Sequence, residues 1–378
     1  MKNILTAGAA LLMTTSIATA GGLDRSGQPV GIIFEEGNVG QLTLGFVTPS
    51  VSGTATGPGL TGESGNMAGS YVQVGLAYKQ QLSDQFSLAL IYDQPYGASV
   101  SYAEATGGYY ATGSTADVSS SSINAVGRYQ INENFSVHGG LRYQTVTASV
   151  SKPTAAGYNI NSESDAAVGY LVGAAYERPD IALRVALTYN SAVDHEIVAT
   201  ETCTAPLPGC AGTTATTGVT TPQSVNLDFQ TGVAADTLVF GSIRWAEWTE
   251  FDFAPPVHSS AVPAGIGRGS LQDYDNDVFT YTLGVGRRFN DQWSGAVTLG
   301  YEKANGGFSG DLAPTDGYFS VGLGGSYNIN DATEITAGVR YVMIGDANTE
   351  HPAIPGSVGS EFTDNNVVAI GLQLTTSF

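Results

Sequence analysis

The sequence predicts an all-β fold, a transmembrane antiparallel β-barrel of about 14 strands, and three observations support this prediction. Segments in which apolar and polar residues alternate strictly recur along the chain. Tight polar turns alternate with long stretches rich in Gly, Ser, Thr and Pro. The last segment alternates as well and ends on the aromatic residue Phe378. These features are typical of a single-chain barrel in the outer membrane of a Gram-negative bacterium.

The first residues have the pattern of a secretory signal peptide. Lys2 supplies a positive start, an apolar stretch runs from Ile4 to Met13, and Ala18-Thr19-Ala20 provides a cleavage site of small residues. The apolar stretch is too short to span a bilayer as a helix. We therefore expect a signal peptide at 1–20, a segment preceding the wall at 21–39 and the barrel at 40–378.

Composition argues against several classes of protein. The formal net charge of −20 repels phosphate backbones, so nucleic acid is not an expected partner. Hydrophobic residues make up 42% of the chain, which is too many for a disordered protein. Only 13% of residues are charged, as expected for strands that face lipid on one side. No mature segment offers about 18 consecutive apolar residues, so a helical membrane span is not expected.

Six short turns predict twelve strands, because each turn joins two strands. Asn, Asp and Ser favour such turns through bonds to the nearby backbone. One further strand at each end, about 41–52 and 367–378, brings the predicted total to about 14. The stretches between hairpins are expected to be extracellular loops, at 53–69, 103–118, 202–222, 254–275, 303–316 and 346–364. The turns lie between Tyr78 and Phe86, Tyr129 and Phe135, Tyr176 and Ile181, Phe229 and Val239, Phe289 and Trp293, and Tyr327 and Ile335.

Arginines identify the inner face of the predicted wall. A strand arginine at mid-depth in lipid would cost about 2–4 kcal/mol, so we expect the face that carries arginines to line the lumen. Pairs such as Phe135 and Tyr143 are eight residues apart, which at a tilt of ~40° spans about 20 Å of height. This height fits an outer-membrane apolar band with aromatic residues at both rims. The arginines opposite the aliphatic face are Arg128, Arg142, Arg184, Arg244, Arg288 and Arg340.

The third predicted strand carries an irregularity. It alternates from Phe86 to Tyr92 and then continues as Asp93-Gln94-Pro95-Tyr96-Gly97-Ala98. Proline cannot donate a ladder hydrogen bond, and glycine weakens a strand. The sequence therefore predicts either a kink or gap in the wall here, or a strand that ends at Asp93 and is followed by a loop to residue 118.

The chain resembles the FadL family (OmpP1/FadL/TodX) of outer-membrane transporters for long-chain fatty acids and other hydrophobic compounds, in its short alphaproteobacterial form. The run at 93–98 carries the resemblance, together with Asp24-Arg25-Ser26-Gly27-Gln28, the segment at 34–38 and the segment at 48–53. The resemblance implies that 21–39 is a hatch inside the lumen, with Asp24, Arg25, Ser26, Gly27 and Phe34 as hatch residues. It also implies a lateral opening at Pro95, Tyr96 and Gly97.

These features together predict an outer-membrane channel that takes up hydrophobic compounds, long-chain fatty acids foremost. Capture outside, passage past the hatch and lateral release into the membrane would follow in turn. Trp248, Phe251 and Phe253 could form an apolar entrance or could simply cover the loops. The alternatives are a general polar porin and a structural or adhesive barrel. Expected partners are a hydrophobic small molecule, outer-membrane lipid and lipopolysaccharide, and the barrel assembly machinery, with the protein a monomer.

Cys203 and Cys210 are the two cysteines of the chain. In an exported protein, two cysteines so close together predict a disulfide within an extracellular loop. Asp194 and His195 could suggest catalysis, but adjacent strand residues point to opposite faces, so we do not expect an enzyme. No cofactor and no metal site are predicted.

Overall fold

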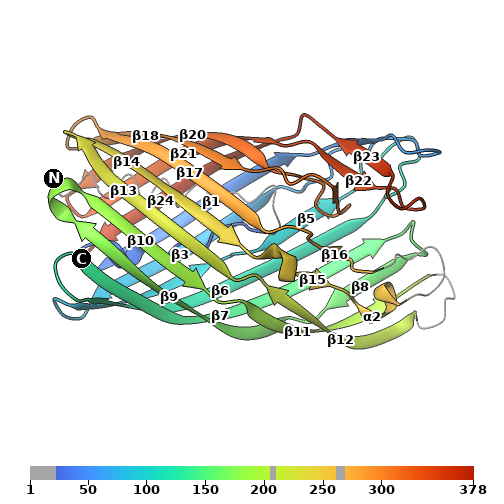
Figure 1. Cartoon of the computed structure of the whole chain (residues 1–378), viewed down its shortest axis with the longest axis horizontal. Coiled ribbons are helices and arrows are strands. Elements are labelled where there is room, and N and C mark those ends of the chain that lie inside the picture. The colour runs from blue at the N-terminus through green and yellow to red at the C-terminus, as the bar shows by residue number, and fades with distance from the viewer. Residues whose placement is uncertain (1–22, 205–209, 261–268) are drawn as a thin grey trace.

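A computed structural model describes residues 23–204, 210–260 and 269–378 (Figure 1). The predicted signal peptide lies outside these residues. Within them, the chain forms a closed antiparallel barrel of 14 strands, which confirms the predicted fold. The first wall strand pairs with the last, from Val39 opposite Ser377 to Ser50 opposite Asn366, and so closes the sheet. This pairing removes the sheet edges that the first and last strands would otherwise expose to lipid.

Each wall strand pairs with the next wall strand along the chain, and β1 pairs with β24 to close the barrel. In order they are β1 (Val39–Ser50), β3 (Tyr71–Gln81), β4 (Phe86–Asp93), β6 (Thr115–Gln130), β7 (Phe135–Lys152), β9 (Asp165–Arg178), β10 (Leu183–Asn190), β13 (Ser224–Ala234), β14 (Thr237–Ala246), β17 (Val278–Arg288), β18 (Trp293–Glu302), β20 (Tyr318–Asn330), β21 (Thr333–Ile344) and β24 (Asn366–Ser377).

Every predicted tight turn joins two wall strands at the end where the C-terminus lies (Figure 1). Asparagine side chains build several of these turns. Asn132 accepts hydrogen bonds from the backbone of Asn134 and Phe135 at 2.9 Å, and Asn290 bonds the backbone of Trp293 at 2.8 Å. Such local bonds are the physical reason that Asn marks turns in the sequence.

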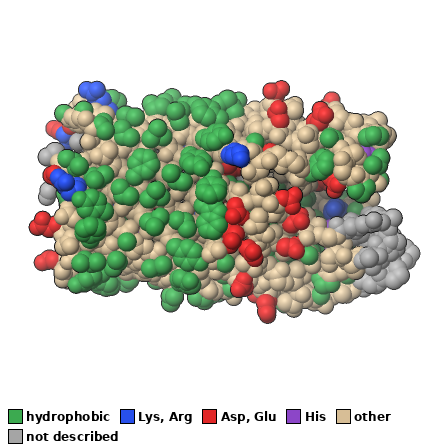
Figure 2. Space-filling model, viewed as in Figure 1, with side chains coloured by type: hydrophobic (Ala, Val, Ile, Leu, Met, Phe, Trp, Pro, Cys, Tyr) green, Lys and Arg blue, Asp and Glu red, His purple; other side chains and the backbone are tan. Residues whose placement is uncertain are grey.

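The two faces of the wall have opposite chemistry, as the alternation predicts. Leu141, Leu299 and Trp293 are among the exposed apolar side chains, whereas Arg142, Arg244 and Arg340 are buried on the inner face. Figure 2 shows hydrophobic side chains covering the part of this surface nearer the C-terminus, with acidic side chains beyond their border. The apolar band and the inward arginines fit a wall surrounded by lipid.

Several segments extend beyond the apolar band at the far end of the barrel. Part of the predicted loop at 202–222 is a strand, because Thr-rich β12 pairs with β11 along most of its length. A small sheet also joins three of the predicted loops, at 53–69, 303–316 and 346–364, because short strands from each pair with one another. Among the described residues, no helix is long and apolar enough to span a membrane. The additional elements are η1 (Gly31–Phe34), β2 (Gly53–Ala55), β5 (Gly97–Ser101), β8 (Tyr158–Ser162), η2 (Pro179–Ile181), β11 (Val193–Thr202), β12 (Ala211–Thr221), η3 (Trp248–Glu250), β15 (Asp252–Phe253), α2 (Pro256–Ser259), β16 (Gln272–Asp273), β19 (Phe308–Ser309), β22 (Ala347–Glu350) and β23 (Val358–Phe362).

Candidate functional site

The wall is interrupted between β3 and the third strand of the barrel. The β3–β4 ladder begins at Gln81 opposite Ser87 and ends at Leu76 opposite Tyr92. After Asp93 the strand breaks, and it resumes as β5 at Gly97, paired only with β6. Among the described residues, no ladder joins 71–75 of β3 to β4 or β5. We call this break the wall gap.

Pairing resumes beyond the wall gap, so the gap is bounded at both ends. Ala68 forms a bridge with Val100, and the Gly69 N–H donates to the Ser99 carbonyl at 2.8 Å. Across the gap itself, the side chain of Gln94 takes the place of one backbone acceptor, because its Oε1 accepts a hydrogen bond from the Val74 N–H at 2.8 Å. The third strand is therefore interrupted after Asp93 and continues from Gly97. Of the two alternatives that the sequence left open, the structure has the gap in the wall and not a loop from Asp93 to residue 118.

The residues at the break pair with the N-terminal segment (residues 23–38) instead of with β3. The Arg25 N–H donates to the Pro95 carbonyl at 2.7 Å, and the Gly97 N–H donates to the Leu23 carbonyl at 2.9 Å. Between these two bonds, Asp24 forms a bridge with Tyr96. A short strand-like contact thus compensates for the ladder bonds that the wall loses at Pro95.

Arg25 occupies the wall gap. Its guanidinium carbon lies 3.9 Å from the centroid of the Tyr71 ring, a cation–π contact with a β3 residue. On the other side, a Cβ added to Gly97 would lie 2.5 Å from the same guanidinium carbon. Burial lowers the pKa of Arg25, and its Nε has no hydrogen-bond partner among the described residues. The Arg25 side chain therefore fills the space between Tyr71 and Gly97.

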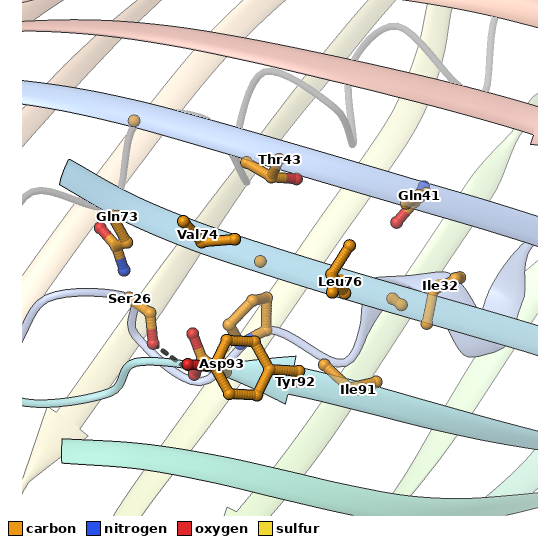
Figure 3. Close-up of a pocket in the computed structure, with 14 residues that line it drawn as sticks. Ser26, Ile32, Gln41, Thr43, Gln73, Val74, Leu76, Ile91, Tyr92 and Asp93 are labelled. Atoms are coloured by element: carbon orange, nitrogen blue, oxygen red, sulfur yellow. Dashed lines mark hydrogen bonds between the residues drawn. The ribbon is translucent and has the colours of Figure 1, made fainter.

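Side-chain hydrogen bonds hold the rest of this segment against the lumen wall. Ser26 Oγ donates to Asp93 Oδ2 at 2.5 Å (Figure 3), and Gln28 Nε2 donates to the Tyr96 hydroxyl at 3.0 Å. Asp24 forms an ion pair with Arg244 of β14 at 3.0 Å. The backbone also contributes, because the Gly27 carbonyl accepts from Asn226 Nδ2 at 2.9 Å and from Arg244 Nη1 at 3.4 Å.

Apolar contacts seat the second half of the N-terminal segment. Ile32 and Ile33 of η1 are each 1% exposed, and they pack in one cluster with Ile91 of β4 and Leu171 of β9. Phe34 lies between two inward arginines, with the Arg128 and Arg184 guanidinium carbons 4.9 and 4.7 Å from its ring centroid. This apolar part of the lumen is thus covered by the chain itself.

A small pocket opens beside the wall gap (Figure 3). Inward-facing residues line one part of it: Gln41 and Thr43 of β1, Gln73 of β3, and Ile91 and Asp93 of β4. Strand alternation places Val74, Leu76 and Tyr92 on the outward face, and these residues line the pocket as well. Ser26, Pro29 and Ile32 of the N-terminal segment close its inner side. The pocket therefore takes its lining from both faces of the wall.

The three predicted entrance residues are buried rather than at the surface, and one of them contacts the break. Trp248, Phe251 and Phe253 are 0%, 8% and 6% exposed, in the core of the part beyond the apolar band. Trp248 meets the Tyr96 ring edge-on, with centroids 5.6 Å apart. Whether they act as an entrance stays a prediction.

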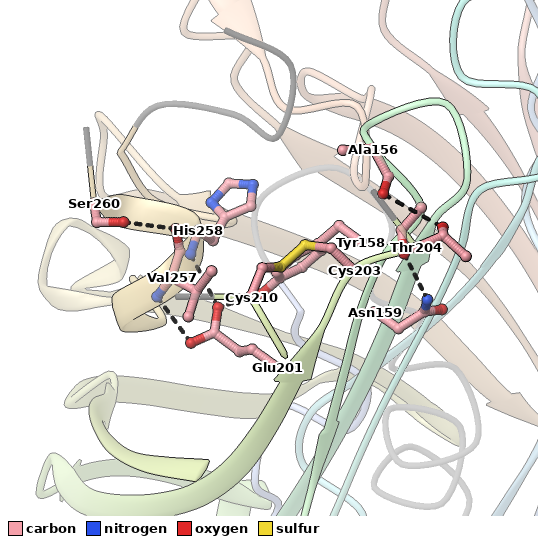
Figure 4. Close-up of a disulfide and its surroundings, with 11 residues drawn as sticks. Ala156, Tyr158, Asn159, Glu201, Cys203, Thr204, Cys210, Val257, His258 and Ser260 are labelled. Atoms are coloured by element: carbon pink, nitrogen blue, oxygen red, sulfur yellow. Dashed lines mark hydrogen bonds between the residues drawn. A yellow bond between two sulfur atoms is a disulfide. The ribbon is translucent and has the colours of Figure 1, made fainter. Parts of the chain in front are cut away.

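Cys203 and Cys210 form a disulfide at the tip of the β11–β12 hairpin (Figure 4). Nearby, the Glu201 carboxylate accepts hydrogen bonds from the Tyr158 hydroxyl and from the backbone N–H groups of Val257 and His258. The His195 ring bonds Asp165 Oδ2 at 2.8 Å, whereas Asp194 bonds Thr220 on the opposite face. Among the described residues, no group of acidic, histidine or cysteine side chains is arranged to hold a metal ion.

Sequence reasoning located the break but missed most of its contacts. Gln28 and Gln94 were not singled out, and the inward arginine Arg244 gave no sign of its partner Asp24. Gln28 lies between Gly27 and Pro29, and Gln94 precedes Pro95. These positions could have indicated the contacts, because a glutamine amide can both donate and accept hydrogen bonds where backbone bonds are lost.

Known structures share this architecture. A FadL homologue of Pseudomonas aeruginosa is similar with a TM-score of 0.77 and 14% identity, over 99% of this chain and 98% of that one. The toluene transporter TodX of P. putida gives 0.63 and 13%, over 92% of each chain. The toluene transporter TbuX of Ralstonia pickettii gives 0.62 and 13%, over 98% of each. At these identities the likeness shows the fold alone.

The sequence provides the family assignment. No curated protein is significantly similar in sequence. However, the family described as outer membrane protein transport protein (OMPP1/FadL/TodX) matches residues 34–378, most of the 378-residue chain. This match confirms the resemblance and the outer-membrane location expected from the sequence. The chain, a closed barrel with an interrupted wall, therefore belongs to the OMPP1/FadL/TodX family of outer membrane transport proteins.

Proposed function

We propose that this protein takes up hydrophobic compounds, long-chain fatty acids foremost, and releases them sideways through the wall gap into the outer membrane. One observation carries the proposal: the pocket beside the gap is lined by inward residues such as Gln73 and by outward residues such as Leu76. A solute in this pocket would contact both the lumen side and the lipid side of the wall.

The physical chemistry of an apolar cargo favours this route. Burying apolar area is worth about 25 cal/mol per Å², so a hydrophobic molecule gains free energy at each apolar site it reaches. The outer-membrane interior is such a site, whereas the aqueous space beyond the barrel is not. Release through the wall would therefore be favourable, because the cargo never has to enter water.

The N-terminal segment would act as the hatch of this route. In the present state Arg25 fills the wall gap, and Ser26 and Pro29 line the inner side of the pocket. Each contact of the segment is modest, since a single hydrogen bond contributes about 0.5–1.5 kcal/mol. A cargo that occupies the pocket could therefore displace Arg25 and Ser26 without unfolding the barrel.

The relatives leave the cargo open among hydrophobic classes. TodX and TbuX are named as toluene transporters, and a further similar structure, CymD, as a monoaromatic hydrocarbon channel. A polar porin and an adhesive barrel are the other readings of the sequence. Uptake of radiolabelled oleate, toluene and a sugar by cells that lack and then regain the protein would distinguish them, and uptake of the sugar alone would contradict the proposal.

Bridging the wall gap tests the lateral route directly. We expect a Gln73→Cys/Gln94→Cys double variant, joined by a short thiol-reactive linker, to lose most oleate uptake, because the linker ties β3 to the break. The matched control is Ser326→Cys/Thr336→Cys, a directly opposite inward pair in the continuous β20–β21 ladder, away from the pocket. Equal uptake by the bridged gap variant and the bridged control would refute lateral release.

A further inference from the structure

His351 begins a tight turn at the far end of the barrel, directly after β22. Its Nδ1 atom accepts hydrogen bonds from the backbone N–H groups of Ala353 and Ile354, each at 3.0 Å. The His351 backbone closes the same turn, because its N–H donates to the Ser357 carbonyl at 2.8 Å. The histidine is 7% exposed, whereas Ile354 is 43% exposed. A buried imidazole therefore organises a turn that solvent reaches.

The second ring nitrogen of His351 connects this turn to a different loop. His351 Nε2 donates to the carbonyl of Pro58, in the loop that follows β2, at 3.1 Å. The ring also packs closely on this facing loop, since a Cβ added to Gly57 would lie 2.7 Å from His351 Cδ2. We call the hydrogen bonds of the His351 ring with Pro58, Ala353 and Ile354 the loop clasp.

The loop clasp requires a neutral imidazole. An atom that accepts two N–H groups carries a lone pair, so Nδ1 is unprotonated and Nε2 carries the proton donated to Pro58. In an imidazolium both ring nitrogens are donors. A proton on Nδ1 would face the N–H groups of Ala353 and Ile354, and both bonds would be lost. Histidine ordinarily changes charge between about pH 5 and pH 8, so mild acidification is sufficient for this loss.

The chain builds the same kind of turn elsewhere with a side chain that does not titrate. Asn132 accepts hydrogen bonds from the backbone N–H groups of Asn134 and Phe135, the second and third residues after it, at 2.9 Å. His351 bonds the second and third residues after it in the same way. An asparagine amide has no charge to gain at ordinary pH. Histidine at position 351 therefore adds pH dependence to a turn that does not need it.

The elements around the loop clasp carry carboxylates but no lysine or arginine. Glu350 precedes His351 and accepts a hydrogen bond from the Gly356 N–H at 2.7 Å. Glu361 of β23 and Glu63 of the facing loop are both exposed. Among the described residues, none of these three carboxylates bonds the His351 ring. No positive side chain of the two loops would oppose a charge on the ring.

We propose that the loop clasp is a pH-sensitive switch, which opens when His351 takes up a proton. One proton from solvent binds Nδ1, the two bonds to the turn break, and Nε2 keeps its proton and its bond to Pro58. The clasp is therefore closed at higher pH and opens as the pH falls. The facing loop ends at Ala68 and Gly69, which bound the wall gap, so the switch acts on the loop that forms one border of the gap.

Hydrogen–deuterium exchange of the folded protein in lipid nanodiscs, at about pH 7.5 and about pH 5.5, tests this proposal. Each exchange rate is divided by that of an unstructured chain at the same pH, which removes the intrinsic effect of pH. We expect protection of the Ala353 and Ile354 amides to fall about tenfold at the lower pH, because two hydrogen bonds are lost. The Phe135 amide, bonded by Asn132, should keep its protection and serves as the internal control.

His351→Asn is the matched variant, because asparagine keeps an acceptor for the turn and does not titrate. We expect its turn to be equally protected at both pH values, and the turn of His351→Ala to be unprotected at both. Glu350→Gln retains an acceptor for Gly356 without a titrating group, and the pH dependence should persist in it. Heat-modifiable migration on gels verifies that each barrel is folded.

Four results would each overturn the proposed switch. They are unchanged protection of the wild-type turn at the lower pH, an equal fall in His351→Asn, disappearance of the pH dependence in Glu350→Gln, and a matching fall at Phe135. The last of these would indicate a general loosening of the protein. None of the four bears on the proposed uptake function, because the exchange experiment contains no cargo.

Discussion

Gly97 and Arg25 show how a single residue can control the wall gap. Glycine is needed at position 97 because the Arg25 guanidinium approaches its backbone closely, and any side chain would compete for that space. Arg25 in turn gains its contact with the Tyr71 ring only while it stays there. The absence of a side chain at one position thus determines whether the gap is filled.

We expect Gly97→Ala to displace Arg25 from the wall gap, because the new Cβ would lie 2.5 Å from its guanidinium carbon. Trypsin cleaves after accessible arginines, so cleavage at Arg25 should become several-fold faster, as followed by intact-protein mass spectrometry. Gly45→Ala is a suitable control, since the nearest side-chain atom to its Cβ would be Gln73 Cβ at 3.5 Å, an ordinary contact. Unchanged protection of Arg25 in Gly97→Ala would show that the close approach does not hold the segment.

At the scale of elements, the N-terminal segment replaces part of a wall strand. Pro95 removes one donor and bends the chain, and the freed backbone groups bond Leu23 and Arg25 instead of β3. These bonds satisfy the backbone groups of Pro95 and Gly97, whereas residues 71–75 of β3 have no ladder partner on one side. Unpairing in a barrel wall is therefore tolerated here because another segment supplies the missing bonds.

Two features stabilise the β11–β12 hairpin, the backbone ladder along its length and the disulfide at its tip, and the ladder does not depend on the disulfide. In Cys203→Ser/Cys210→Ser we expect a local loss of about 2–3 kcal/mol at the hairpin tip, from the entropy of closing a short loop. The barrel should persist, because β11 and β12 remain paired from Val193 to Thr202. Faster proteolysis at the tip with unchanged heat-modifiable migration would support this expectation, and loss of the folded barrel would contradict it.

The side chains on the outer surface of the barrel change in chemical type along the barrel axis. Apolar side chains cover the outside where lipid would lie, and acidic side chains gather beyond that border (Figure 2). The outward position of Phe378 continues this pattern to the last residue, where its ring lies 6.3 Å from that of Tyr78. The protein thus carries one chemistry outside the wall and another inside it along the same strands.

The cost of a charge on the outer surface should depend on its height. We expect Leu299→Arg, near the middle of β18, to lower the free energy of unfolding by roughly 2–4 kcal/mol. Ile329→Arg is the matched control, because Ile329 is similarly exposed, at 48% against 44%, but lies beside a turn. Urea unfolding in lipid vesicles would measure both, and equal losses would contradict the assignment of the apolar band.

The wall could be predicted from the sequence because its signals are local. Alternation specifies which residues face lipid, and Asn- and Asp-rich turns specify where strands reverse, so strand number and orientation followed from short stretches of chain. The irregular run from Asp93 to Gly97 was likewise visible, since proline and glycine act on their own backbone. Strands within the predicted long loops, such as β12 and β23, were missed, because their pairing depends on other segments.

By itself, the sequence determined that this chain is a barrel of about 14 strands in the outer membrane with an irregular third strand, because period-two patterning and backbone-specific residues act locally. The tertiary structure alone decided what fills the irregularity. Arg25 and Gly97 are distant in the sequence, as are Asp24 and Arg244, and only barrel closure brings each pair together.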